Sequence, residues 1–355
     1  MNTIPTTFNE NLPTYTAVGG NERRASTGIS AVVLNRGGRY PRYSFFEELE
    51  KLRFDYVISI ESSAAHYDLE SLSSSFPFVR FILPQERLNR GEEINLAASE
   101  LSCPLFFVLW NDLKFLRSGG AERMAERLLA GAQEEKNIFK RLCTTPLIQD
   151  ARSETMPTLI VPALVPEKKT GRTIKAIPFV PRKEGQLTIY PFDGIGIYDR
   201  ERFIRLNGFD PYIKNFYWQL MDFGFRSSLW GEEIASTRLI KLSYEGSVPE
   251  EDSTAGEDFL RFFLKNLAPV FKGDYAHIPL RRFPGYLRRR GGLLTAWDEL
   301  SSARAWVKTN RFRFSTDARI MTELFTSVET EAKSETESDD DRDDLARDES
   351  TMEEK

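Results

Sequence analysis

The sequence of 355 residues is 41% hydrophobic and 12% aromatic, a composition that suits one large or two small globular domains. The formal net charge of −5 hides an uneven distribution: residues 327–355 carry 13 acidic and 4 basic side chains, whereas the rest of the chain carries 44 basic and 40 acidic ones. Two cysteines provide neither a disulfide framework nor a cysteine-rich metal site. The chain has no apolar run near the roughly 20 residues of a membrane span and no signal-peptide pattern, so we expect a cytoplasmic protein.

The elements predicted along the chain alternate between strands and helices. This alternation favours a parallel sheet with helices on both faces, an α/β fold. Apolar runs predict strands at 29–34, 56–60, 78–83 and 104–110, and helical patterns cover 45–52 and 91–98. Further along, we expect a helix at 121–140, short strands within 143–190, a glycine-broken apolar stretch at 186–198 and a helix at 257–267.

Four segments follow from these patterns. Residues 1–27 are polar and are predicted to be flexible. Residues 28–250 form the predicted α/β domain, and residues 251–326 form a basic helical extension. Residues 327–355 lack apolar content and are predicted to be a disordered acidic tail.

The most informative segment is the apolar run Pro104 to Trp110, which stops abruptly at Asn111-Asp112. A continuous apolar run is typical of a strand that is buried on both faces. The carboxylate after such a strand lies at the carboxyl edge of the sheet, where open α/β sheets bind their ligands. The predicted helix upstream begins near Gly91 and carries Asn95 among small and apolar residues.

This order of strand, glycine turn, asparagine-bearing helix and strand ending in an acidic residue resembles the nucleotide-sugar half of family 2-like glycosyltransferases with the GT-A fold. The resemblance covers about residues 28–245. It implies a Rossmann-type mixed sheet flanked by helices, a nucleotide-sugar donor and a glycan or lipid-linked acceptor with a free hydroxyl. Trp110-Asn111-Asp112 takes the place of the acidic DxD-type motif of that family.

Asp112 is the leading candidate for a metal ligand. A nucleoside diphosphate commonly binds through a divalent cation, here Mn²⁺ or Mg²⁺, that shares oxygen ligands between carboxylates and phosphates. Asn111 offers a weaker carbonyl ligand. Trp110 replaces the first acidic residue of the motif, which lowers the expected affinity for a metal ion. The alternative is an ordinary solvated aspartate at a strand end.

Further donor contacts are implied after the first two strands. Asn35-Arg36 follows the first strand, where the family contacts the nucleoside, and Arg36 has the geometry for a two-point contact with phosphate. Glu61 follows the second strand, where the family receives the uracil or ribose. Asn95 completes the implied donor set. The alternatives are a solvated arginine at position 36 and a helix-capping role for Glu61 and Ser62.

The acceptor half of the resemblance rests on Gly208-Phe209-Asp210, followed by the stretch 219–226. In inverting members the first aspartate of that stretch is the general base, and here Leu220 stands at its position, after Gln219. Leucine has no lone pair with which to accept a proton. Asp222, Asp210 and Asp193 are therefore the remaining candidates for the base.

A histidine that often completes the metal shell of the family is also replaced. The matching segment is Leu242 to Ser247, with Tyr244 at the histidine position. Glu245 is a candidate oxygen ligand in its place.

The C-terminal extension has a strongly basic part. Residues 259–314 hold 12 basic and 3 acidic side chains together with many aromatic ones. Each basic residue near an anionic lipid leaflet contributes about 1 kcal/mol, and aromatic residues add interfacial burial. We therefore expect a peripheral membrane surface on the cytoplasmic side. The segment has no recognised nucleic-acid motif, and the alternative is a basic face that is solvated or covered by the acidic tail.

The leading functional hypothesis is transfer of a sugar from a nucleotide-sugar donor to a hydroxyl acceptor by inverting displacement. The substitutions Trp110, Gln219, Leu220 and Tyr244 also favour a second hypothesis, a glycosyltransferase-like binding or scaffold protein that has lost catalysis. A third hypothesis is an interaction protein that works through residues 259–314.

Overall fold

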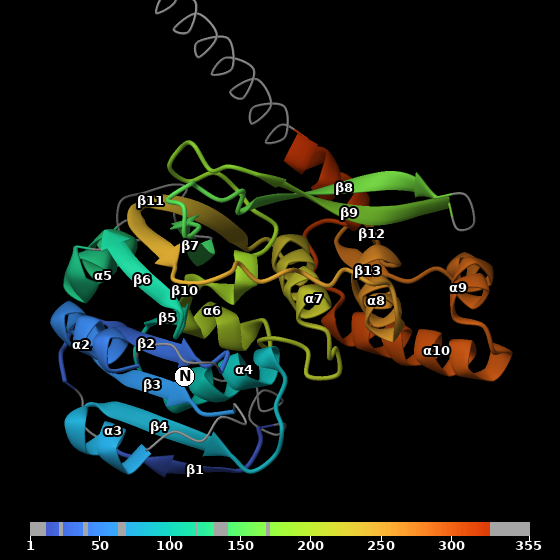
Figure 1. The fold of residues 1–355 in the computed structure, drawn as a ribbon. Coiled ribbons are helices and arrows are strands. Elements are labelled where there is room, and N and C mark those ends of the chain that lie inside the picture. Colours follow the sequence, from blue (N-terminus) through green and yellow to red (C-terminus); the bar gives the residue numbers. More distant parts are fainter. Residues whose placement is uncertain are drawn as a thin grey trace, which may run out of the picture.

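The structure is a computed structural model that describes residues 12–20, 24–37, 42–62, 69–117, 119–130, 141–167 and 171–326. A central sheet has nine strands in the order β1-β4-β3-β2-β5-β10-β7-β11-β6 (Figure 1). These strands are β1 (Tyr15–Val18), β2 (Ile29–Leu34), β3 (Val57–Ile60), β4 (Val79–Pro84), β5 (Leu105–Trp110), β6 (Leu113–Arg117), β7 (Arg141–Gln149), β10 (Gly196–Asp199) and β11 (Glu233–Tyr244).

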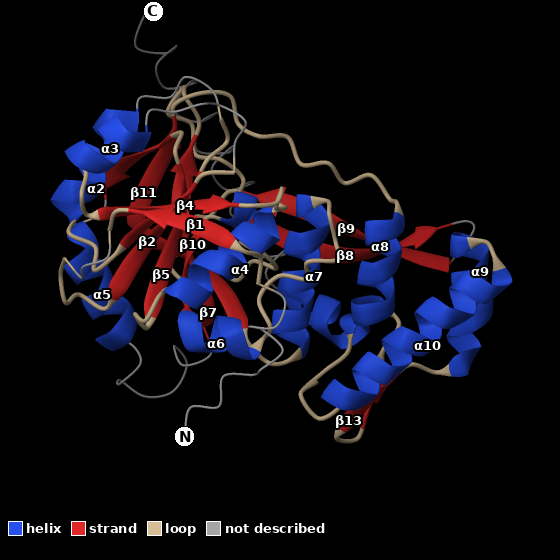
Figure 2. Cartoon of the chain, turned by 90° about the horizontal axis from the view of Figure 1, so that it is seen from below, coloured by secondary structure: helices blue, strands red, loops and turns tan. Residues whose placement is uncertain are grey.

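The middle of the sheet is buried on both faces. Every residue of β2 and β5 is buried, which explains why both segments are continuous apolar runs. The helices of this part are α2 (Arg42–Leu52), α3 (Leu69–Ser75), α4 (Arg90–Glu100), α5 (Gly120–Ala130), α6 (Arg200–Arg205) and α7 (Phe216–Leu229). Figure 2 shows α2, α3 and α5 on one side of the strands and α4, α6 and α7 on the other. The predicted α/β class, a mixed sheet flanked by helices, is confirmed.

Strand direction decides which chain segments meet at the carboxyl edge. Strands β2, β3, β4 and β5 are mutually parallel, and β10 runs antiparallel between β5 and β7. Strand β7 therefore runs parallel to β5, and β11 runs parallel to β7. The ends of β2, β3, β5 and β11 and the start of β10 consequently lie at one edge of the sheet.

A helical C-terminal extension packs against α7, beside the sheet (Figure 1). Its aromatic contacts include Trp218 with Phe259, with ring centroids 4.9 Å apart, and Phe225 with Phe262, 5.1 Å apart. The extension contains α8 (Glu257–Phe262), the π-helix η3 (Phe263–Leu267), β12 (Val270–Lys272), β13 (Tyr275–His277), η4 (Leu280–Arg282), α9 (Phe283–Arg290), α10 (Leu293–Asn310) and a final helix at 318–326. A hairpin of β8 (Leu159–Glu167) and β9 (Gly171–Phe179) forms a separate two-stranded sheet.

Several boundaries differ from the sequence-based expectation. Strand β1 lies inside the segment 1–27 that we expected to be flexible, where its backbone pairs with β4 and forms the edge of the sheet. Helix α5 ends at Ala130 within the described residues, and both 131–140 and the predicted tail 327–355 lie outside them. The domain boundary near residue 250 stays a prediction. Within the part of the chain that the structure describes, no helix has both the length and the hydropathy to cross a membrane.

Candidate functional site

The carboxyl edge of the sheet brings together side chains from four strand ends. Arg36 follows β2, Asp112 follows β5, Asp193 precedes β10 and Tyr244 ends β11. Glu245 joins them, because its amide donates a hydrogen bond of 2.8 Å to the carbonyl of Asp112. Asp112, which follows the predicted strand 104–110, therefore lies at the carboxyl edge of the sheet.

Arg36 occupies the centre of this edge. Its Nε donates to Asp112 Oδ2 at 2.8 Å, and both of its terminal nitrogens donate to the carboxylate of Asp193. The guanidinium carbon lies 3.8 Å from the ring centroid of Trp110. The backbone amide of Arg36 donates to Asn111 Oδ1 at 3.1 Å. One guanidinium thus links the two carboxylates and lies over an aromatic face.

Asp193 is held in a strained conformation to meet Arg36. Its φ of 55° is in the left-handed region, which costs a non-glycine residue roughly 1–2 kcal/mol. The hydroxyl of Tyr244 donates to Asp193 Oδ2 at 2.8 Å, and Trp110 Nε1 donates to its carbonyl at 2.9 Å. Strain that surrounding contacts maintain in this way concentrates at functional sites. Trp110 and Tyr244, which depart from the family pattern, both hold Asp193.

Asp112 and Asn111 are buried but only partly satisfied. Asp112 is 1% exposed and Asn111 is 2% exposed. Among the described residues, neither Asp112 Oδ1 nor Asn111 Nδ2 has a hydrogen-bond partner. Burial raises the pKa of the Asp112 carboxyl, and the ion pair with Arg36 opposes that shift without cancelling it. Unpaired buried polar atoms are costly, so a polar ligand that reached these two atoms would gain hydrogen bonds there.

The predicted donor residues after β3 form a more complete network. Glu61 accepts hydrogen bonds from both terminal nitrogens of Arg42, at 2.8 and 2.5 Å, and from Ser59 at 2.7 Å. Asn35 Nδ2 donates to Glu61 at 3.3 Å. Arg42 is 5% exposed, so Glu61 is its main counter-charge. This network fixes Glu61 at the edge beside the loop that carries Arg36.

Arg90 is a second cation at this edge that the sequence analysis did not single out. It begins α4, donates to both oxygens of Glu93 at 3.0 Å, and lies 5.0 Å from the ring centroid of Trp110. The capping box formed by Asn89 and Glu92 fixes this first turn. In the sequence, an arginine at the first turn of a helix gives little indication of a binding site. Only the contact with Trp110 in the structure places Arg90 at this edge.

The donor set does not fit a divalent cation. Asp112 is paired with Arg36, and the expected second ligand, Glu245, is paired with Lys114 at 2.5 Å. Among the described residues, no group of three or more histidine, cysteine, aspartate or glutamate side chains is placed to hold a metal ion. The positive charge at this position is instead the guanidinium of Arg36.

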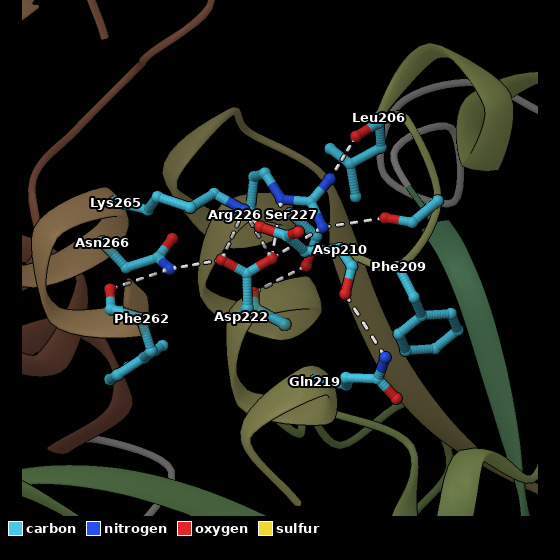
Figure 3. A network of polar contacts seen from close by, with 12 residues as sticks. Leu206, Phe209, Asp210, Gln219, Asp222, Arg226, Ser227, Phe262, Lys265 and Asn266 are labelled. Carbon is cyan, nitrogen blue, oxygen red and sulfur yellow. Dashed lines mark hydrogen bonds and ion pairs between the residues drawn. The ribbon is translucent and has the colours of Figure 1, made fainter. Parts of the chain in front are cut away.

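The other two predicted carboxylates lie in a separate cluster between α7 and the C-terminal extension (Figure 3). Asp222 is fully buried and accepts hydrogen bonds from Arg226 at 2.9 Å, Lys265 at 3.0 Å and Asn266 at 2.8 Å. Asp210 is paired with Lys265 at 2.7 Å and with Arg261 at 2.8 Å. We call this group of six residues the junction cluster.

The electrostatics of the junction cluster favour permanent charges. Burial raises the pKa of the Asp222 carboxyl, but Lys265 and Arg226 outweigh burial and hold that pKa below its usual range. Burial acts in the same direction on Asp210, and its pairs with Lys265 and Arg261 hold the pKa of that carboxyl well below its usual range. A carboxylate that is this hard to protonate is a poor general base.

Asn95 connects α4 to the loop before α7, and Gln219 connects α7 itself to the start of α4. Asn95 makes two reciprocal hydrogen bonds of 2.8 Å with the backbone of Phe209. Gln219 accepts from the amide of Gly91 at 3.0 Å and donates to Asn89. A side chain at position 91 would meet Phe209 at 2.6 Å, which explains the glycine that precedes the asparagine-bearing helix. Asn95, predicted to bind the donor, thus contacts protein backbone and not the edge.

Glu251 is a carboxylate near the edge that no sequence pattern indicated. The hydroxyl of Tyr190 donates to its Oε2 at 2.9 Å. Glu251 is a solvent-exposed residue, and the partial burial of its carboxyl group raises the pKa, a shift that the hydrogen bond from Tyr190 only partly opposes. Glu251 also lies close enough to Tyr244 to contribute to the raised pKa of that phenol, whose main cause is burial. It lies in the loop after β11, where no periodicity marks a residue.

Comparison with known proteins gave distant structural similarities only. No protein-family model and no curated protein matches the sequence. Among solved structures, the chain is similar to GalNAc-T7 with UDP, GalNAc and Mn²⁺, at 13% identity and a TM-score of 0.47, with 72% of this chain and 48% of that chain covered. It is similar to TarS of S. aureus at 12% identity and a TM-score of 0.44, with 66% and 38% covered. It is also similar to the mannosyltransferase PcManGT from Pyrobaculum calidifontis in complex with GDP-Man and Mn²⁺, at 9% identity and a TM-score of 0.41, with 92% and 85% covered. The chain therefore spans about half or less of the length of the first two.

Proposed function

We propose that the protein binds a nucleotide-sugar donor at the carboxyl edge of its sheet and transfers the sugar to a hydroxyl acceptor. The observation that carries this proposal is the convergence of Arg36, Asp112 and Asp193 from three separate strand ends. Ligands of open α/β sheets bind at this edge. The motif order in the sequence, which resembles family 2-like glycosyltransferases, supports the same site.

The donor would lie along the edge between two groups of polar side chains. Glu61 and Asn35 would face the nucleoside, because they form a fixed pair after β2 and β3. Arg36 and Arg90 would face the diphosphate, because guanidinium groups match phosphate oxygens in charge and geometry.

Glu251 is the base that we propose for the acceptor hydroxyl. A general base needs an accessible lone pair and a pKa close to the working pH. Its pKa is raised by burial, whereas Asp222 and Asp210 have lowered pKa values and Asp193 is paired with Arg36 through both oxygens. We therefore assign Asp193 to the positioning of Arg36, and Asp210 and Asp222 to the framework.

The proposal is tested by calorimetry with UDP, GDP and a panel of nucleotide sugars, and by release of the nucleoside diphosphate from the donor that binds. Glu251→Gln should lower release about 10²–10⁴-fold and leave nucleotide affinity unchanged. The rate of the wild type should fall as pH drops through the raised pKa of Glu251, and the variant should lack that limb. The neighbouring Glu250, which is exposed as Glu251 is, provides the control, Glu250→Gln, which should match the wild type. Absence of nucleotide binding would contradict the proposal.

A binding protein without catalysis is the second candidate. The observation that favours it is Leu220, which is 1% exposed and stands where the family carries its base. In that case nucleotide binding would persist, no donor would be cleaved at any pH, and Glu251→Gln would change nothing. The same two measurements therefore separate the candidates.

We further propose that the tip of the C-terminal extension contacts an anionic membrane surface, which would suit a lipid-linked acceptor. Leu293, Leu294 and Trp297 of α10 are 60%, 80% and 46% exposed. Arg281 and Arg282, which precede α9, are also exposed. Figure 1 shows α9 and the start of α10 at the end of the molecule away from α2 and α5. Apolar and basic side chains side by side are the combination that interfacial binding requires.

Vesicle flotation tests this surface. The full chain should bind vesicles that contain phosphatidylserine more strongly than neutral ones, and high salt should weaken binding. Leu294→Asp should reduce binding, whereas the control Leu324→Asp, at a leucine that is 65% exposed on the final helix, should not. Equal weak binding to both vesicle types would contradict the proposed surface.

A further inference from the structure

The position that a divalent cation would take at the sheet edge is filled by a side chain. We propose that the diphosphate of the donor binds without a metal ion, and that the guanidinium of Arg36 is the cation that links Asp112 and Asp193 to the phosphates. This inference rests on the proposed nucleotide-sugar site and specifies its chemistry.

Arg36 has the connectivity that this role requires. A guanidinium has five N–H donors in one plane. Three of them are used, one by Asp112 at Nε and one at each terminal nitrogen by Asp193. Among the described residues, the other two N–H groups, one on each terminal nitrogen, have no hydrogen-bond partner and could donate to phosphate oxygens. The side chain is 20% exposed, so a ligand can reach it from solvent.

Trp110 explains why a guanidinium replaces an ion here. An acidic residue at this position would add a third carboxylate to the edge, and a tryptophan adds an aromatic face. The guanidinium of Arg36 lies 3.8 Å from that ring centroid and that of Arg90 lies 5.0 Å from it. Cations are attracted to such a face, and more strongly where water is excluded. Trp110 is 1% exposed and therefore gathers two positive charges at one buried ring.

The unpaired atoms beside Arg36 match the groups of a donor. Asn111 Nδ2 and Asp112 Oδ1 are buried and have no partner in the part of the chain that the structure describes. The amide provides N–H donors for a phosphate oxygen, and the carboxylate oxygen accepts from a hydroxyl of the sugar. Both residues are at least nine-tenths buried, so satisfying them with a ligand removes a desolvation cost. These contacts would add to those of Arg36 in holding a diphosphate at this edge.

Titration of UDP and GDP by calorimetry in EDTA and in Mn²⁺ tests the inference. The dissociation constant should agree within about twofold between the two conditions. In EDTA, Arg36→Met should weaken binding about 10–100-fold, which corresponds to the loss of one or two charged hydrogen bonds. Arg24→Met is the matched control, because Arg24 also pairs with a carboxylate, Glu50, and lies 4.2 Å from the ring centroid of Phe78, away from the edge.

Direct Mn²⁺ binding gives an independent measurement by electron paramagnetic resonance. The wild type should leave Mn²⁺ free, whereas Arg36→Met should bind it, because the variant leaves Asp112 and Asp193 without their shared cation. Arg36→Lys keeps the positive charge but removes the planar set of guanidinium N–H donors. It should also bind nucleotide more weakly than the wild type and should not bind Mn²⁺.

The outcomes separate the two proposals. If the wild type binds nucleotide only in Mn²⁺, the inference is overturned and the proposed donor site is retained. If no nucleotide binds in either condition, the donor site itself is overturned, and the inference with it. If Arg36→Met and Arg36→Lys both bind nucleotide as tightly as the wild type in EDTA, another group neutralises the diphosphate and the inference is overturned.

Discussion

Two groups of carboxylates and cations in this protein have similar composition, but their buried aspartates are paired to different extents. In the junction cluster, both oxygens of the fully buried Asp222 receive hydrogen bonds, from Arg226, Lys265 and Asn266 (Figure 3). Asn266 itself has an amide oxygen without a partner among the described residues. At the sheet edge, Asp112 is also buried, and only one of its oxygens is paired within the described part of the chain. We therefore assign Asp222 to the fold and propose Asp112 for ligand contact.

Chain connectivity explains the difference. The junction cluster joins α7 to the π-helix η3, whose wide turn directs both Lys265 and Asn266 at Asp222. The side chains at the sheet edge come from four strand ends, and two N–H groups of Arg36 have no hydrogen-bond partner among the described residues. We therefore expect substitutions in the junction cluster to lower stability most, and substitutions at the sheet edge to affect ligand binding.

The largest expected effect is on stability at the junction cluster. Asp222→Ala leaves Arg226 and Lys265 buried with too few counter-charges, which should cost about 3–5 kcal/mol of unfolding free energy. Asp298→Ala, at an exposed aspartate of α10, should change it by less than about 0.5 kcal/mol. Urea denaturation followed by circular dichroism measures both. Equal stability of the two variants would remove the distinction between the clusters.

The pH dependence of stability should have the same origin. Because the folded pKa values of Asp210 and Asp222 lie below the unfolded value near 4, their contribution is complete above that pH and is lost as pH falls toward the folded values. Thermal melts between pH 7 and pH 3 should show a steep loss below pH 4. The loss should be smaller in Asp222→Ala, and an unchanged slope would contradict this assignment.

A smaller effect is expected at Gly91, which lies between the two clusters. An added methyl would approach Phe209 at 2.6 Å and Gln219 at 2.7 Å, and overpacking of this kind costs about 1–3 kcal/mol. Gly285→Ala in α9 is the control, because nothing lies within 4 Å of the position that the added methyl would take there. That control should be neutral or stabilising by up to about 1 kcal/mol. Comparable melting temperatures for the two variants would contradict the close approach of α4 to the loop before α7.

The smallest effect on stability is expected at Arg36. Its side chain is 20% exposed, and burial already raises the pKa of Asp112, so that carboxyl can take up a proton when Arg36 is removed. Arg36→Met should therefore cost only about 1 kcal/mol, less than the loss of one partner in a fully buried pair. A cost equal to that of Asp222→Ala, measured by urea denaturation, would assign Arg36 to the framework.

The sheet edge was largely predictable from the sequence, and the contacts across it were not. Asp112 and Glu61 follow apolar runs, and the end of a parallel strand fixes the edge on which they lie. Asp193 approaches Arg36 only because β10 runs antiparallel between β5 and β7, an order that local patterns do not encode. Asp222 and Arg226 have the spacing of a helical ion pair, yet Lys265 and Asn266 reach them from a π-helix that no periodicity indicated. Glu251 lies in a loop and had no signal at all.

Hydrogen–deuterium exchange with and without saturating nucleoside diphosphate would show whether the ligand binds at the sheet edge. We expect ligand protection at amides near Arg36, near Asp112 and at residues 192–196, with no change at residues 219–226 and 262–266. Protection of the junction cluster with none at the sheet edge would contradict this expectation, because the ligand would then bind away from Arg36 and Asp112.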